Sequence, residues 1–366
     1  MSQVFYRKYR PQKFSEFVGQ GPIVKILTQA IAQDRISHAY LFGGPRGTGK
    51  TTLARLLAKA INCEKRKLGT FEPCNECQAC QEIKEGKSID LVEIDAASHR
   101  GIDEIRELRE GVKFLPAKLK YKVYIIDEAH QLTKEAANAL LKTLEEPPSR
   151  TVFVLATTEL HKMIPTIVSR CQTFEFKKLG IQEIALKLKK IAQEEKIKIE
   201  NEAIELIASH ANGALRDAEG ILEKVTIAFP NQIITKKEIE KLLGLFPSSL
   251  SGEFLDFILK KDLKGGFLFI KNLVEKGVDL EEFVKSFLSY LHQILLFKIL
   301  GEKEGEYLAI FTKEELEKLK NQSNLLSPVQ LKIIIENFSE VQYKMKFTPI
   351  VELPLEIALV ETCQKI

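Results

Sequence analysis

The sequence lacks a continuous apolar run of about 18 residues, which is the length that a membrane-spanning helix needs. Its first residues are polar and basic, so the apolar core of a secretory signal peptide is missing too. An excess of charge is also missing: the formal net charge is only +4, which does not by itself indicate a nucleic-acid binder. We therefore expect a cytoplasmic protein without membrane contact, whose basic residues, if they bind DNA, gather on one surface.

Cysteine is scarce, with six residues in 366, yet four of them lie between positions 63 and 80. Cys63, Cys74, Cys77 and Cys80 form the pattern C-x10-C-x2-C-x2-C, whose spacing suits a metal better than disulfides in a reducing compartment. Four thiolates can supply a closed, structural zinc site. An iron–sulfur cluster is the alternative, because C-x2-C-x2-C occurs there as well. Nothing else in the sequence suggests redox chemistry, so zinc is favoured.

The length of 366 residues predicts two or three domains. Short apolar runs alternate with helical spacing in the first half, which indicates an α/β domain with a parallel sheet. The expected strands are 39–42, 91–94, 123–126, 152–156 and 173–176. Helices are expected at 102–112 and at 134–145, the second ended by Pro147 and Pro148. From about Lys178 onward only helical spacing remains.

Residues 44–51 read G-x-x-x-x-G-K-T and follow an expected strand, as a phosphate-binding loop requires. Backbone N–H groups of such a loop surround phosphate oxygens, and the following helix directs its N-terminus at them. Lys50 would reach the β- and γ-phosphates of ATP, and the Thr51 hydroxyl would bind Mg²⁺. A glycine-rich turn without a ligand is the alternative, and the strand–loop–helix context argues against it. The expected phosphate-binding residues are Gly44, Pro45, Arg46, Gly47, Thr48, Gly49, Lys50, Thr51 and Thr52.

Asp127 and Glu128 close the third expected strand. An acidic pair at the carboxyl end of a buried strand is what a nucleotide hydrolase needs. Asp127 would hold Mg²⁺, and Glu128 would orient or deprotonate the attacking water. The alternative is a pair of acidic residues at the N-terminus of a helix, which the phosphate loop upstream makes the weaker interpretation.

Two threonines and two arginines are further candidates. Thr157 and Thr158 follow the fourth strand, where a hydroxyl either senses the γ-phosphate or simply ends the strand. Arg170 and Arg216 each lie in a mostly apolar stretch, and an unpaired arginine is costly to bury. Each is therefore expected to face a carboxylate or a phosphate. The residues alone favour a salt bridge for both arginines.

Together these motifs resemble those of the AAA+ ATPases and, more narrowly, those of the bacterial DNA polymerase III gamma/tau family, the motor subunits of the sliding-clamp loader. The resemblance covers roughly the first 220 residues, in order. The matching stretches are Tyr9-Arg10-Pro11, Phe17-Val18-Gly19-Gln20, His38-Ala39-Tyr40-Leu41-Phe42, the cysteines, Glu93-Ile94-Asp95-Ala96-Ala97-Ser98, Asp127-Glu128-Ala129-His130, residues 138–148, Leu155-Ala156-Thr157-Thr158, Ser169-Arg170-Cys171 and Gly213-Ala214-Leu215-Arg216-Asp217-Ala218.

The resemblance implies a role for each candidate. Arg170 would be an arginine finger that acts on ATP in a neighbouring subunit, Arg216 the sensor-2 arginine of the chain's own lid, and Thr158 the sensor-1 residue. The residues implied near the adenine are Tyr9, Arg10, Pro11 and Val18. The implied domains are a Rossmann-like AAA+ domain at 1–177 with a zinc module at 63–80, a three-helix lid at 178–243 and an all-helical collar at 244–366.

The resemblance also implies partners: the delta and delta-prime subunits, further copies of the chain through the collar, the sliding clamp and primer–template DNA. ATP binding would drive clamp opening and DNA binding, and hydrolysis would release the clamp on DNA. DNA would be held through its phosphates. Arg100 and Lys142 fit positions that face DNA in the family, or they are solvated helix faces.

Two other functions compete with an ATPase motor subunit. A delta-prime-type subunit of the same machine would not hydrolyse ATP, and the intact Lys50 and Asp127–Glu128 pair argue against it. A different AAA+ motor, such as a Holliday-junction helicase, should lack the cysteine cluster. We expect either a gamma-like short form or a shortened tau, and we assign no polymerase tethering to this chain.

Overall fold

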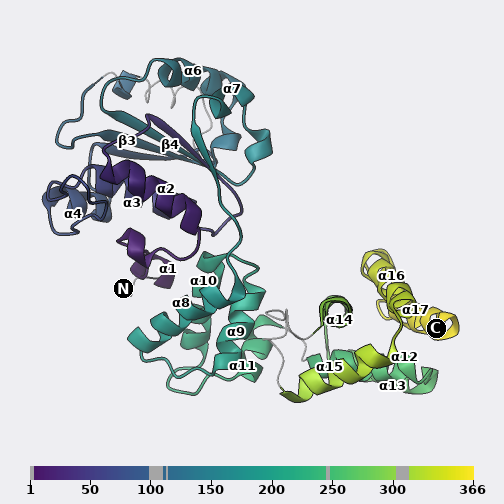
Figure 1. Cartoon of the computed structure of the whole chain (residues 1–366). Coiled ribbons are helices and arrows are strands. Elements are labelled where there is room, and N and C mark those ends of the chain that lie inside the picture. Colours follow the sequence, from purple (N-terminus) through teal and green to yellow (C-terminus); the bar gives the residue numbers. More distant parts are fainter. Residues whose placement is uncertain (1–3, 99–109, 113, 245–247, 302–312) are drawn as a thin grey trace. The chain divides into compact units, whose positions relative to one another are not determined.

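The computed structural model describes residues 4–98, 110–112, 114–244, 248–301 and 313–366 (Figure 1). Most of the helix expected at 102–112, and the candidate DNA contact Arg100, lie outside these residues. The chain divides into two units, one formed by Met1–Lys187 with Ala211–Glu223 and the other by Leu188–His210 with Lys224–Ile366.

The first unit is built around a five-stranded sheet in the order β2-β3-β4-β1-β5. All four neighbouring pairs are parallel, as the sequence predicted. The strands are β1 Ala39–Gly43, β2 Leu91–Asp95, β3 Lys122–Asp127, β4 Thr151–Thr157 and β5 Gln172–Glu175. In parallel pairing all carboxyl ends meet at one edge, and Gly43 of β1 pairs there with Thr157 of β4. The sheet thus brings the 44–51 loop, the Asp127–Glu128 pair and the Thr157–Thr158 pair to one edge.

Helices cover both faces of the sheet (Figure 1). Alternate strand residues face opposite ways, so Phe42 and Val154 pack with α2 and α3 while Leu41 and Phe153 pack with α6 and α7. This double burial explains the unbroken apolar runs in the central strands. The described helices between residues 5 and 168 are α1 Phe5–Lys8, η1 Phe14–Glu16, α2 Gly21–Ala32, α3 Lys50–Ile61, α4 Gln78–Glu85, η2 Ala129–Gln131, α6 Lys134–Glu145, η3 Leu160–Lys162 and α7 Pro165–Val168.

Local sequence signals set the ends of α6. The Thr133 hydroxyl accepts a hydrogen bond from the Ala136 N–H, which caps the first turn. The helix ends at Glu145, just before the two prolines, as predicted.

Four helices lie between residues 178 and 243, where the sequence analysis expected a three-helix lid: α8 Ile181–Glu194, α9 Asn201–His210, α10 Leu215–Ala228 and α11 Lys236–Leu243. The additional short helix α11 begins with a capping box formed by Thr235 and Glu238 and ends at Gly244, whose φ is +64°. The expected domain bounds themselves remain predictions.

Helices alone make up the described part of the chain beyond residue 247: α12 Ser248–Leu259, α13 Leu263–Glu275, α14 Leu280–Leu300, α15 Lys313–Leu325, α16 Pro328–Met345 and α17 Leu353–Lys365. Their core is rich in phenylalanine, with Phe254 contacting Phe269, Phe283, Phe287 and Phe338.

Helix α14 is long and apolar enough to cross a membrane by length and composition, which the sequence analysis did not anticipate. Its buried side chains, among them Phe283, Phe287 and Leu291, belong to the core of the helical region. Glu281 and Glu282 occupy its first turn. These contacts are those of a central core helix.

Candidate nucleotide and metal sites

The phosphate-binding loop joins β1 to α3 at the carboxyl edge of the sheet. Gly44, Gly47 and Gly49 have φ values of 138°, 77° and 99°, in the region that favours glycine. A Cβ on Gly44 would lie 2.3 Å from the carbonyl oxygen of Phe176, and one on Gly49 would lie 2.6 Å from the ring of Phe17. The loop therefore requires glycine there, and α3 begins directly after it, with its N-terminus facing the loop.

The side chain of Lys50 is held inside this loop. The residue is 6% exposed, and its Nζ donates hydrogen bonds to the carbonyl oxygens of Gly44 at 2.7 Å and Pro45 at 2.8 Å. Burial lowers the pKa of Lys50, and the carboxylates of Glu128 and Asp127 partly offset that effect. A phosphate group would give this ammonium the full negative charge that two neutral carbonyls lack.

Thr51, at the start of α3, and Asp127, at the end of β3, are in direct contact. The Thr51 hydroxyl donates to Asp127 Oδ2 at 2.7 Å, and Asp127 Oδ1 accepts the N–H of Glu128 at 3.0 Å. A hydroxyl and a carboxylate are oxygen ligands of the kind that Mg²⁺ prefers. The pair therefore fits a magnesium site beside the phosphate loop.

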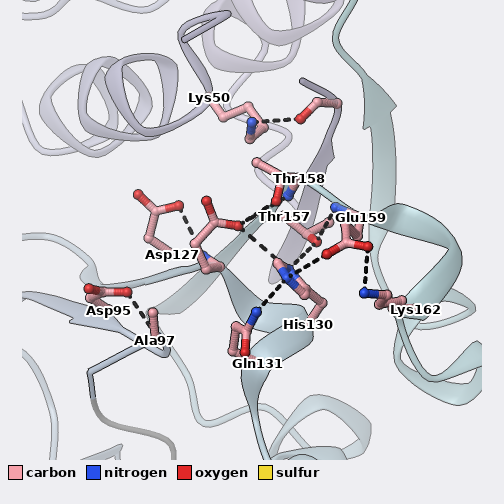
Figure 2. A network of polar contacts seen from close by, with 12 residues as sticks. Lys50, Asp95, Ala97, Asp127, His130, Gln131, Thr157, Thr158, Glu159 and Lys162 are labelled. Carbon is pink, nitrogen blue, oxygen red and sulfur yellow. Dashed lines mark hydrogen bonds and ion pairs between the residues drawn. The ribbon is translucent and has the colours of Figure 1, made fainter. Parts of the chain in front are cut away.

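A polar network at the ends of β3 and β4 includes His130, Thr157 and Thr158 (Figure 2), and Glu128 belongs to it. Thr158 donates to Glu128 Oε2 through its hydroxyl at 2.8 Å and its N–H at 3.3 Å. The buried His130 places Nδ1 3.0 Å from Thr157 Oγ1 and 3.5 Å from Glu128 Oε2, and its Nε2 lies 3.3 Å from Glu159 Oε1. The orientation of the Glu128 carboxylate thus depends on Thr158 and His130.

A cleft of about 890 Å³ runs along this edge, and basic side chains outnumber acidic ones on its walls. That balance favours a polyphosphate. The sequence-predicted residues that line the cleft are Arg10, Pro11, Val18, Arg46, Gly47, Thr48, Gly49, Lys50, Thr51, Thr52, Asp127, Glu128 and Arg216. Among the described residues, Gly44, Pro45, Tyr9 and Thr158 are not part of this lining. Gly44 and Pro45 instead supply the carbonyls that hold Lys50.

Arg216 lies near the start of α10, on the wall of the cleft. Its guanidinium stacks 4.7 Å from the ring centre of Tyr6, which also lines the cleft. Tyr9, expected near the adenine, packs edge-on against Phe5, so in the first helix the aromatic side chain on the cleft wall is that of Tyr6.

Arg170 and Lys142 lie away from the cleft in the described structure. Arg170 donates to Glu145 Oε1 at 2.6 Å and to the Thr166 carbonyl at 2.8 Å, and its side chain is 32% exposed. This is the salt bridge that the residues alone favoured. Lys142 is exposed on α6, with no role in the core.

The four clustered cysteines converge. Their sulfur atoms all lie within 4.8 Å of one another, and those of Cys74 and Cys80 are 3.9 Å apart. A tetrahedral zinc ion with Zn–S bonds of about 2.3 Å places its sulfurs roughly 3.8 Å apart. The arrangement can therefore hold one metal ion, with a modest contraction.

Backbone N–H groups favour the thiolate form of Cys74, whereas burial raises the pKa of Cys63 and Cys80. The N–H groups of Glu76 and Cys77 donate to Cys74 Sγ at 3.4 and 3.3 Å, and that of Cys74 donates to Cys63 Sγ at 3.3 Å. Burial raises the pKa of Cys74, but the N–H groups of Glu76 and Cys77, with the thiols of Cys63 and Cys77, outweigh it and lower that pKa to about 7. The site suits a cation that binds thiolates.

Sequence reasoning missed several residues of these sites. His130 stood within a quoted motif but received no role, and Tyr6, Phe17 and Glu219 of the cleft wall were not assigned to it. Only their position in space marks them, because an isolated histidine, aromatic or glutamate carries no local pattern.

Three successive stretches of the chain match models of known protein families. Residues 19–180 match the family model described as DNA polymerase III, delta subunit. Residues 183–230 match that of the DNA polymerase III clamp loader subunit, ATPase lid domain. Residues 234–365 match that of DNA polymerase III subunits gamma and tau, domain III.

The chain is 41% identical over 363 residues to the DNA polymerase III subunit tau of Bacillus subtilis, covering 99% of this chain and 63% of that protein. It is 44% identical to subunit gamma/tau of Mycoplasma pneumoniae, covering 78% of this chain and 41% of that protein. It therefore spans about half the length of these two relatives.

Among solved structures, the RuvB Holliday junction branch migration motor of Thermotoga maritima is 19% identical with a TM-score of 0.49, covering 74% of this chain and 86% of that one. A likeness of this degree supports no conclusion about function.

The DNA polymerase III subunit gamma of Buchnera aphidicola subsp. Acyrthosiphon pisum is 37% identical over 372 residues, covering 100% of this chain and 99% of that protein. The chain thus belongs to the family of DNA polymerase III gamma and tau subunits.

Proposed function

We propose that this chain is the ATPase motor subunit of the bacterial sliding-clamp loader, an AAA+ protein that works in the cytoplasm during DNA replication. One observation carries the proposal: Lys50, the Thr51–Asp127 pair and the Thr158–Glu128 pair meet at one edge of the sheet beside a basic cleft. Membership of the gamma and tau family supports it.

In this proposal the cleft binds ATP. The loop N–H groups and Lys50 hold the phosphates, while Arg10, Pro11, Val18 and neighbouring residues enclose the adenine; the assignment of Tyr9 to the adenine stays a prediction. Thr51 and Asp127 hold Mg²⁺, which when bound neutralises phosphate charge. Arg216 reports the γ-phosphate from the chain's own lid.

Glu128 is the proposed base. It accepts the proton of the attacking water or orients that water, and Thr158 sets the direction of its carboxylate. Arg170 supplies positive charge to the ATP site of a neighbouring subunit. To do so it must break its ion pair with Glu145 and contact that site instead. Hydrolysis at one site therefore depends on the adjacent chain.

The proposed assembly contains the delta and delta-prime subunits and further copies of this chain, joined through the helical collar. ATP binding opens the sliding clamp and favours primer–template DNA, and hydrolysis leaves the clamp on DNA. Lys142 and Arg100 are the proposed DNA contacts; Lys142 is exposed, as that role requires. The cysteine cluster is proposed to hold zinc in a structural role.

The test is ATP hydrolysis with and without clamp and primed DNA, after mixing with candidate delta and delta-prime subunits. Lys50→Ala and Glu128→Gln should abolish DNA-stimulated hydrolysis, and the exposed control Glu194→Gln should not. Full activity in both cleft variants would refute the proposal. Wild-type chain that binds no nucleotide would instead favour the non-hydrolysing delta-prime type.

A further inference from the structure

The cysteine module, residues 63–80, contacts a segment of the chain that lines the nucleotide cleft. We call residues 10–17 the cleft segment; Arg10, Pro11, Gln12 and Phe17 within it line the cleft. The contacts involve two charged side chains, Glu72 and Lys59.

Glu72, inside the cysteine module, accepts two backbone hydrogen bonds from the cleft segment. Its Oε2 accepts the N–H of Phe14 at 2.9 Å and its Oε1 accepts the N–H of Ser15 at 2.8 Å. Beside this contact the rings of Phe71 and Phe14 pack edge to face, 6.3 Å apart. A carboxylate bound through both oxygens fixes the direction of the backbone as well as its distance.

Lys59 of α3 forms hydrogen bonds to both the cleft segment and the cysteine module. It is 3% exposed, and its Nζ donates to Gln12 Oε1 at 2.6 Å and to Asn75 Oδ1 at 2.7 Å. Asn75 lies between two of the cysteines, and Gln12 donates in turn to the carbonyl of Arg10 at 3.0 Å. Four thiolates around one divalent cation carry a net negative charge, which favours a buried ammonium nearby.

The other end of the cleft segment rests on the phosphate loop. The ring of Phe17 lies so close to Gly49 that a Cβ there would be 2.6 Å from it. The cleft segment is therefore held between the cysteine module and the phosphate loop, and a shift of the module would move a wall of the cleft.

We infer that the metal-loaded cysteine module positions the cleft segment for nucleotide binding, so that metal content sets the affinity of the cleft for ATP. Glu72 and Lys59 are the positioning residues that transmit this effect. The inference rests on the proposed function, in which the cleft binds ATP and the module binds zinc.

The experiment titrates the purified full chain with a fluorescent ATP analogue and Mg²⁺ while zinc content is measured. Chelation of the metal and Glu72→Ala should each raise Kd about tenfold, which is only part of what the two charge-assisted hydrogen bonds to Glu72 contribute, because these bonds position the cleft wall without contacting the nucleotide. Glu72→Gln retains one acceptor oxygen and should give a smaller loss. Lys67→Ala is the matched control, since Lys67 is an exposed charged residue of the same module.

A double-perturbation cycle decides whether metal and Glu72 act together. Chelation of the Glu72→Ala chain should add little to either loss, because both break one connection. Additive losses, or a Glu72→Ala chain that keeps its zinc and the parent affinity, would overturn the inference. A parent chain that binds no nucleotide would overturn the proposed function and this inference with it. A parent chain that binds nucleotide but contains no zinc would overturn the metal assignment on which the inference rests.

Discussion

Glu219 gives the chain a pH-dependent stability. Its side chain is on the cleft wall, on α10, and the residue is only 5% exposed. Burial raises the pKa of Glu219 to about 8, and the charge of Lys187 offsets this only in part. In the unfolded chain the pKa of Glu219 is the ordinary 4.5, so the carboxyl group loses its proton at lower pH than in the folded chain. Stability is therefore full below about pH 4.5 and falls as the pH rises towards 8.

The size of this effect follows from the two pKa values. Between them, each pH unit costs about 1.4 kcal/mol of unfolding free energy. From pH 5 to pH 8 the expected loss is about 3.5 kcal/mol, less than three full pH units would give because the group is partly titrated at both ends, and a large part of the stability of an ordinary domain. Glu219→Gln stays neutral and should escape the loss, so it should be the more stable chain at pH 8 by about that amount, and nearly equal to the parent at pH 5.

Urea unfolding followed by circular dichroism at pH 5, 6.5 and 8 measures the difference. Glu194→Gln, an exposed substitution on α8, should keep the pH dependence of the parent. If Glu219→Gln and the parent lose stability in parallel between pH 5 and pH 8, the burial argument is wrong.

Two further predictions concern the sites, and a third concerns the buried carboxylate of Asp90. Thr158→Val removes the hydroxyl that orients Glu128, so turnover should fall at least tenfold while the Kd for nucleotide changes little; equal loss of both would contradict the assigned role. Cys80→Ser should reduce zinc content and lower the melting temperature by several degrees, as calorimetry and elemental analysis would show. Asp90→Asn should cost about 2 kcal/mol in urea unfolding, because the carboxylate accepts three N–H groups from residues 117–119; an unchanged midpoint would show that they find other partners.

Much of the fold could be predicted from local patterns. The five strands, their parallel arrangement and the end of α6 follow from apolar runs, alternation with helices and two prolines. Helical spacing was expected throughout 178–243, and the number of helices was harder to predict, since α11 has only eight residues and two turns give a weak periodic signal.

The candidate sites divide in the same way. The phosphate loop and the cysteine pattern are local in sequence, so their residues were expected together. Thr51 and Asp127 are 76 residues apart and still meet at 2.7 Å, an encounter that the sequence suggested only through strand order. His130, Tyr6 and Glu219 have no such pattern, and Arg170 forms an internal ion pair with Glu145, although the family resemblance directs it to a neighbouring chain.

The sequence by itself determined which residues could bind phosphate and metal, because glycine spacing, a lysine at a helix start and clustered thiols are properties of short segments. Only the tertiary structure decided which distant groups share a site. The parallel sheet gathers the carboxyl ends of β1, β3 and β4, and packing seats the cysteine module against residues 10–17. Burial, which raises the pKa of Glu219 and lowers that of Lys50, exists only once those parts have assembled.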